Sequence, residues 1–139
     1  MRKFISLAVV ALLASSMSAQ TIANMKDLNA EKKSAAINLK LTGTLTTTKN
    51  SDFRQLRDLC WQLRNLDLSE ATCPVLPKNA FHSRHHLQHI ILPNQLQEIG
   101  TQAFFACDNL QEVVIPKSVT KVGAAAFSGC KSLKNITIE

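Results

Sequence analysis

Four histidines lie close together near the middle of the sequence and are the first candidates for chemistry. They are His82, His85, His86 and His89. Imidazole is a common metal ligand, and a helix would bring His82 and His86 to one face at a spacing that metal sites use. The surrounding segment supplies no acidic or cysteine side chain that would complete the ligand set. We therefore expect exposed histidines and no functional metal site, with adventitious metal binding as the alternative.

Four cysteines are the second candidates, namely Cys60, Cys73, Cys107 and Cys130. In an exported chain, such a set often forms disulfides. Here Cys107 and Cys130 occupy the same position of a sequence repeat, and stacked equivalent side chains run parallel, which is poor geometry for a disulfide. A catalytic thiol would need an accessible sulfur and an activating base. We therefore expect free thiols in the core.

Motifs of other enzymes and of nucleic-acid binding are missing from the sequence. It contains no Gly-x-Ser-x-Gly, no glycine-rich phosphate loop and no recurring pair of inward carboxylates. Its basic residues are scattered and are not interleaved with aromatic residues. The sequence thus predicts a protein that is not an enzyme, holds no cofactor and does not bind nucleic acid.

The N-terminus has the pattern of an export signal. Residues 1–14 combine a short basic start with an apolar run too brief to cross a bilayer, and small residues follow at 15–19. We expect a signal peptide at 1–19, an N-terminal segment at 20–35 and a repeat domain at 36–139. No later apolar stretch is long enough for a membrane span. The chain is therefore expected to be secreted or held at the cell surface.

The second half of the sequence matches itself at a shift of 23 residues. The matching pairs include Pro93 and Pro116, Gly100 and Gly123, Phe104 and Phe127, Cys107 and Cys130, and Leu110 and Leu133. A third unit precedes these two and carries Arg84 in place of the recurrent cysteine, and a more diverged fourth unit contains Cys60. Before them, an opening unit combines a predicted strand at 37–41 with a helix. Ser51 or Asp52 would cap that helix, which carries the apolar residues Phe53, Leu56, Leu59, Cys60 and Leu63 on one face.

Each repeat unit contains an L-x-x-L-x-L pattern, such as Leu110, Val113 and Ile115. A strand alternates inward and outward residues, so the apolar positions of stacked units build one continuous core. The Ala-Phe pairs are expected to begin a short helical or irregular turn on the opposite side. We expect Gly100 and Gly123 where the chain turns tightly.

The segment 115–138 reads I-P-x-S-V-T-x-V-G-x-x-A-F-x-G-C-x-x-L-x-x-I-x-I and resembles the 23-residue BspA-like leucine-rich repeat of bacterial surface proteins. Residues 39–45 and 66–69 are similar to the N-terminal portion of those proteins. The resemblance covers residues 36–139. It implies an α/β fold, a right-handed leucine-rich-repeat solenoid of about four repeats plus an N-terminal strand and helix unit. More loosely, it implies adhesion to host or neighbouring-cell proteins.

The outward residues of successive strands are expected to form a protein-binding face. In register they are Asn38 and Lys40, Asn65 and Asp67, His89 and Ile91, Glu112 and Val114, and Asn135 and Thr137. We expect Ile91 and Val114 to be an exposed apolar centre in a polar rim, the alternative being that they are present because they favour strands. Trp61 is either an exposed aromatic anchor or a side chain covered by the segment 22–36.

Two functions are consistent with the sequence. One is a secreted or surface recognition module that grips a host, matrix or neighbouring-cell protein through the strand face. The other is a structural or assembly piece, or a shortened relative of longer arrays, that self-associates through its C-terminal edge. The second follows from the sequence stopping at Glu139, directly after a predicted strand and without a polar capping unit.

Overall fold

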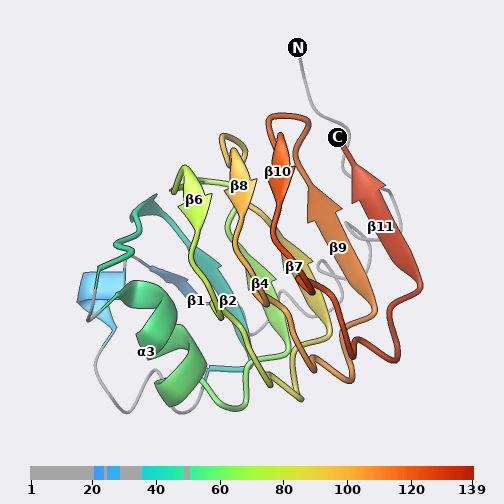
Figure 1. Cartoon of the computed structure of the whole chain (residues 1–139). Coiled ribbons are helices and arrows are strands. Elements are labelled where there is room, and N and C mark those ends of the chain that lie inside the picture. Colours follow the sequence, from blue (N-terminus) through green and yellow to red (C-terminus); the bar gives the residue numbers. More distant parts are fainter. Residues whose placement is uncertain (1–20, 24, 29–35, 49–50) are drawn as a thin grey trace.

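The chain winds into stacked turns whose neighbouring strands pair in parallel (Figure 1). The computed structural model describes residues 21–23, 25–28, 36–48 and 51–139. The predicted signal peptide at 1–19, its cleavage region and parts of the segment 20–35 lie outside the described residues.

The largest sheet takes one strand from each turn, and its six strands lie in the order β1, β2, β4, β7, β9, β11. Their bounds are β1 Thr21–Ala23, β2 Asn38–Leu41, β4 Asn65–Asp67, β7 His89–Ile91, β9 Glu112–Ile115 and β11 Asn135–Ile138. The strand predicted at 37–41 is thus β2. Each turn of the chain brings the next strand to the same place, so strands that follow one another in this sheet are also hydrogen-bonded neighbours.

Shorter strands hold a second side of the stack together. A three-stranded sheet joins β6 (Val75–Leu76), β8 (Glu98–Ile99) and β10 (Lys121–Val122), while β3 (Gly43–Thr44) pairs with β5 (Ala71–Thr72). A 3-10 helix, η2, spans Met25–Asp27. Figure 1 shows β6, β8 and β10 along one side of the stack and the large sheet behind them.

The turns that close each repeat are also stacked through backbone hydrogen bonds. Phe81 N donates to Ala103 O at 2.7 Å, and Phe104 N donates to Ala126 O at 2.8 Å. Two positions of this turn adopt a left-handed backbone in consecutive repeats. The first is occupied by Asn79, Gln102 and Ala125, and the second by Ser83, Ala106 and Gly129, with φ between 54° and 78°. The recurrence shows that the repeat imposes this conformation even where the residue is not glycine.

The opening unit contains helix α3, Asp52–Leu59. Ser51 is its N-cap, and the Ser51 hydroxyl accepts a hydrogen bond from Arg54 N at 3.2 Å, which satisfies one of the free amides of the first turn. Phe53 and Leu56 are buried as predicted, whereas Leu59 is 41% exposed. Leu59 is the last residue of a short helix, and the chain leaves α3 before this side chain meets the core.

The core is one continuous cluster built from equivalent positions of successive turns. Its centre is a column of phenylalanines. The rings of Phe53 and Phe81 meet edge to face at 5.9 Å, and Phe81, Phe104 and Phe127 then stack at centroid distances of 5.4 and 5.1 Å. Such pairs contribute beyond the apolar area that they bury. The phenylalanine of each Ala-Phe pair therefore fills the space between neighbouring layers.

The reason for the recurrent glycine differs from the one predicted from the sequence. Positive φ occurs at Gly43 and Gly129, not at Gly100 or Gly123. A Cβ atom at Gly100 would lie 2.6 Å from Leu76 O of the preceding turn, and one at Gly123 would meet the backbone of Thr101. Close approach of neighbouring turns, not a tight local turn, requires glycine at these positions.

Regular helix is scarce in the described residues, which contain α3 and the single turn of η2. The segments opposite the strands are hydrogen-bonded turns where the sequence allowed short helices. The architecture is a β-solenoid of about four turns with the opening unit at one end. The α/β class and the right-handed winding stay predictions. Within the described residues, no helix combines the length and apolar character needed to cross a membrane.

Candidate protein-binding face

The ten outward residues predicted as a binding face lie in two rows across the large sheet. The first row consists of Asn38, Asn65, His89, Glu112 and Asn135. The second row consists of Lys40, Asp67, Ile91, Val114 and Thr137. We call these two rows the strand face. Parallel strands without register shifts bring together residues that are more than twenty positions apart in sequence.

Polar side chains of the first row bond to one another along the stack. Asn65 Nδ2 donates to Asn38 Oδ1, and Asn135 Nδ2 donates to Glu112 Oε1 at 3.0 Å. Between these pairs, His89 Nδ1 and Glu112 Oε2 lie 3.5 Å apart. Side chains of the first row are thus joined by hydrogen bonds at both ends of the row, whereas His89 and Glu112 in the middle make only a longer contact.

A charged cluster occupies the β2 and β4 end of the second row. Lys40 Nζ lies 2.6 Å from Glu70 Oε1 and 3.7 Å from Asp67 Oδ2. The hydrogen bond to Glu70 raises the pKa of Lys40, with the charges of Asp67 and Glu70 adding to it and burial opposing it. Asp67 also accepts a hydrogen bond from Ser69 N at 2.9 Å, so its carboxylate is held in place. This end of the strand face is therefore ordered and carries two acidic groups around one lysine.

The expectation that Ile91 and Val114 are exposed is wrong, because they are only 3% and 4% exposed. Neither belongs to the core cluster, although Ile90 and Val113 beside them do. The pair therefore packs on the outward side of the sheet. Equivalent side chains on neighbouring parallel strands stand about 4.8 Å apart, so the side chains of Ile91 and Val114 lie side by side. Ile91 also lies between Asp67 and Val114, and Val114 lies between Ile91 and Thr137.

His89 differs from the other three histidines. His85 and His86 are exposed and His82 is half-buried, broadly as predicted, whereas His89 is only 5% exposed. Burial lowers the pKa of His89, and the nearby Glu112 opposes that effect. Nδ1 of His89 and Oε2 of Glu112 are both buried and lack a hydrogen-bond partner among the described residues. Their 3.5 Å separation without hydrogen-bond geometry leaves two polar atoms of the strand face unsatisfied.

The histidines and cysteines do not converge on a metal site within the described part of the chain. His82 instead stacks on the Phe105 ring at 5.1 Å, and His85 Nδ1 lies 3.0 Å from Asp108 Oδ2. These contacts join neighbouring repeats.

All four thiols are free, with Cys130 half-buried and the other three buried. Cys107 Sγ donates to Phe81 O and Cys130 Sγ to Phe104 O, both at 3.0 Å. Burial raises the pKa of the Cys73 thiol, and its hydrogen bond to Val75 O acts against that rise. Cys60, Cys73 and Cys107 are therefore part of the packed interior.

A second candidate site was missed in the sequence. A cavity of about 640 Å³ lies between α3 and the turn at 79–84, away from the strand face. Trp61 borders this cavity and is 51% exposed. Of the two alternatives predicted for Trp61, the structure therefore shows the exposed aromatic side chain and not the covered one. The available signal was Arg84, which interrupts the ladder of cysteines at the same repeat position.

A parallel β-solenoid with inward leucine ladders and an outward strand face defines a leucine-rich-repeat protein. Residues 26–134 match the family described as BspA type leucine rich repeat region (6 copies). The chain belongs to this family.

Two solved structures are similar to this chain. One is a leucine rich cell surface protein from Faecalibacterium prausnitzii A2-165, with a TM-score of 0.54 and 22% identity, covering 87% of this chain and 30% of that chain. The other is a leucine-rich repeat protein from Bacteroides ovatus ATCC 8483, with a TM-score of 0.44 and 20% identity, covering 84% of this chain and 36% of that chain. The chain therefore spans about a third of the length of these proteins. No curated protein matches the sequence.

Proposed function

We propose that this chain is a secreted or surface-held recognition module that binds a protein of the host, the matrix or a neighbouring cell through the strand face. Membership of the BspA type family and the likeness to a leucine rich cell surface protein support this general role. The observation that carries it is the strand face itself, two rows of outward side chains that lie in register across five neighbouring strands.

The strand face fits a protein partner better than a small ligand. Its two rows cross five neighbouring strands, from β2 to β11. Specific protein interfaces are broad, with a hydrophobic centre and a polar rim. The groups of the strand face that a partner would contact are the lysine cluster at one end and Asn135 and Thr137 at the other.

The proposal is tested by comparing captured proteins between matched variants. Asn135→Arg with Thr137→Arg places two bulky charges on the strand face. Thr101→Arg with Thr120→Arg adds the same charges at two exposed positions off that face. Purified protein is immobilised, incubated with matrix and cell-surface extracts, and the captured proteins are quantified by mass spectrometry.

We expect one or more partners to be captured by the unchanged protein and the Thr101/Thr120 variant and to be lost with the Asn135/Thr137 variant. Equal loss with both variants would attribute capture to general charge. Retention of every partner by the Asn135/Thr137 variant would contradict the proposed use of the strand face.

A second candidate function, self-assembly through β11, rests on a different observation. Ile136 and Ile138 pair in register with Val113 and Ile115 of β9. The β9 residues are buried, whereas Ile136 and Ile138 are 49% and 66% exposed. Val122 of β10 is likewise 54% exposed. Inward ladder positions therefore face solvent at this edge of the sheet, and a second copy would cover them.

Sedimentation velocity over a range of concentrations tests this second function. Self-association that weakens at least tenfold on Ile138→Lys with Val122→Lys would support it. Val75→Lys, a similar change at an exposed position of β6, is the control. A monomer at all concentrations would rule out assembly through β11.

A further inference from the structure

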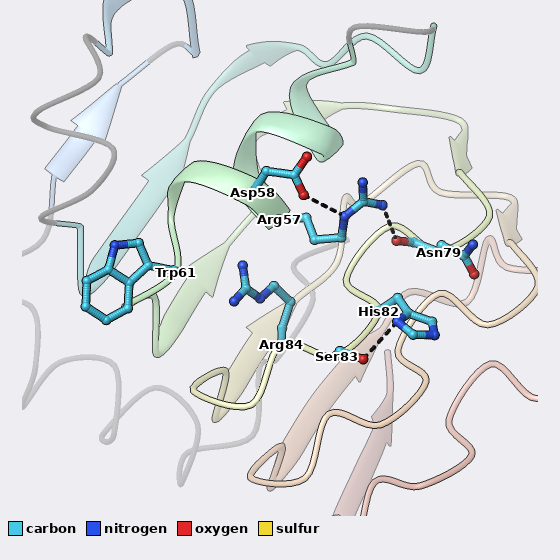
Figure 2. A pocket seen from close by; sticks show the side chains of 7 residues that line it. All are labelled: Arg57, Asp58, Trp61, Asn79, His82, Ser83 and Arg84. Carbon is cyan, nitrogen blue, oxygen red and sulfur yellow. Dashed lines mark hydrogen bonds and ion pairs between the residues drawn. The ribbon is translucent and has the colours of Figure 1, made fainter.

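The cavity beside α3 has a lining unlike that of the strand face. Its seven lining residues are Arg57, Asp58, Trp61, Asn79, His82, Ser83 and Arg84 (Figure 2). Helix α3 supplies the first two, Trp61 follows the helix, and the rest come from the turn of the next repeat. The cavity therefore lies where the diverged opening unit meets the first regular repeat.

Arg84 enters this cavity because it does not suit the interior position that its repeat assigns to it. Cys107 and Cys130 hold the equivalent position in the following repeats and donate to backbone carbonyls inside the stack. A guanidinium on a long side chain is too large and too polar for that place. Figure 2 shows the Arg84 side chain directed into the space between Trp61 and α3.

The other charges of the cavity are already paired. Arg57 Nε donates to Asp58 Oδ1 at 2.9 Å, and Arg57 Nη1 donates to Asn79 O at 3.1 Å. Asp58 Oδ2 accepts a further bond from Arg54 Nε at 3.4 Å. The carboxylate of Asp58 is thus shared by two other arginines.

Arg84 is left as the cavity's unneutralised cation. Within the described part of the chain, its guanidinium has no hydrogen bond and no ion pair, and no dashed line reaches it in Figure 2. Burial lowers the pKa of Arg84, with the charge of Asp58 among the opposing effects. A half-buried guanidinium without a partner is costly, and an anion that accepts its hydrogen bonds removes that cost.

The lining also indicates what kind of anion fits. The two arginines of the lining, Arg57 and Arg84, and its one carboxylate, Asp58, sum to a net charge of one positive unit. A ligand with a single carboxylate neutralises this charge, whereas a phosphate dianion carries more negative charge than the cavity can neutralise. Trp61 offers an exposed aromatic face at the border. Asn79, His82 and Ser83 on the far side are polar. We infer that this cavity binds a sugar that carries a carboxylate, with Arg84 holding the carboxylate, Trp61 packing on the ring, and the polar side chains facing its hydroxyl groups.

Intrinsic fluorescence provides a direct test, because the sequence contains one tryptophan and no tyrosine. The purified protein is titrated with sodium glucuronate, and in parallel with glucose, sodium acetate and inorganic phosphate at equal ionic strength. We expect a saturable change of Trp61 emission with glucuronate at millimolar concentration, as is usual for a single sugar (about 4 kcal/mol). Glucose, acetate and phosphate should each bind at least tenfold more weakly.

Two substitutions at Arg84 and one control complete the experiment. Arg84→Met removes the charge while keeping a long side chain, and Arg84→Cys restores the residue of the neighbouring repeats, which protects the test against misfolding. Both should weaken glucuronate binding at least tenfold. Lys131→Met removes an equal charge at an exposed site that does not line the cavity, and should leave the affinity unchanged.

No saturable response to glucuronate, or an equal response after Arg84→Cys in protein with normal thermal unfolding, would overturn the inference. Phosphate binding as tight as glucuronate binding would show a general anion site and would also overturn it. None of these outcomes bears on the strand face.

Discussion

Gly100 donates its backbone N–H to Leu76 O at 2.8 Å, and a Cβ atom on the same residue would lie 2.6 Å from that oxygen. The bond that joins β8 to the preceding turn therefore leaves no room for a side chain. Gly100→Ala should lower the free energy of unfolding by about 1–3 kcal/mol, the usual cost of inserting a methyl group where packing is tight. Urea denaturation measures this loss. Thr101→Ala, at the exposed neighbour, is the control. If Gly100→Ala costs no more stability than this control, the two turns can move apart to accommodate a methyl group, and the prediction is wrong.

The phenylalanine column predicts a second loss of stability. Phe104 is fully buried and stacks between Phe81 and Phe127. Phe104→Ala should cost about 3–5 kcal/mol because it opens a cavity at the centre of the stack. Phe105→Ala removes a half-buried ring that stacks on His82, and should cost about 1 kcal/mol. Thermal and urea unfolding of the two variants provide the comparison, and similar losses would contradict the central role of the column.

A gain in stability is expected at Ala106. Its φ of 56° lies in the left-handed region, and Gly129 occupies the equivalent place in the next repeat. A residue with a side chain is destabilised by about 1–2 kcal/mol in this backbone conformation. Glycine avoids that strain, but its greater backbone entropy in the unfolded chain lowers stability by about 0.5–1 kcal/mol. Ala106→Gly should therefore raise the free energy of unfolding by roughly 0.5–1 kcal/mol. Ala103→Gly, at a buried position without positive φ, should lower it, and a loss in both variants would contradict the strain assigned to Ala106.

His89 should make stability depend on pH. Burial holds its pKa in the folded protein below the ordinary value of 6.5, against the effect of Glu112, so the unfolded chain takes up the proton first. Stability from this group is complete above pH 6.5 and falls as the pH drops toward the lowered pKa of the folded state. Urea denaturation between pH 5 and pH 8 in roughly half-unit steps measures the dependence.

His89→Gln should flatten the fall below pH 6.5, and His86→Gln, which changes an exposed histidine, should not. An unchanged pH profile after His89→Gln would show that the fall comes from other groups.

The sequence alone determined the repeat, and with it the identity of the ladder positions. A period of 23 residues places Phe81 under Phe104 and His89 under Glu112 without knowledge of any contact. Ser51 was one of two predicted caps, and the structure selects it. Such features follow from local pattern and from stacking, because a unit that cannot bury its apolar face alone must place equivalent residues together.

Tertiary structure decided what covers each residue and how close the turns approach. Alternation along a strand says that Ile91 and Val114 point away from the core, but not that they are shielded. Glycine at 100 is visible in the sequence, while its cause, the Leu76 carbonyl of another turn, is not. The cavity at Arg84 likewise needs α3 and the turn at 79–84 together. The exposure of a side chain, the close approach of two turns and the pairing of a charge all depend on residues that are distant in the sequence. The sequence pattern does not give the distances between such residues.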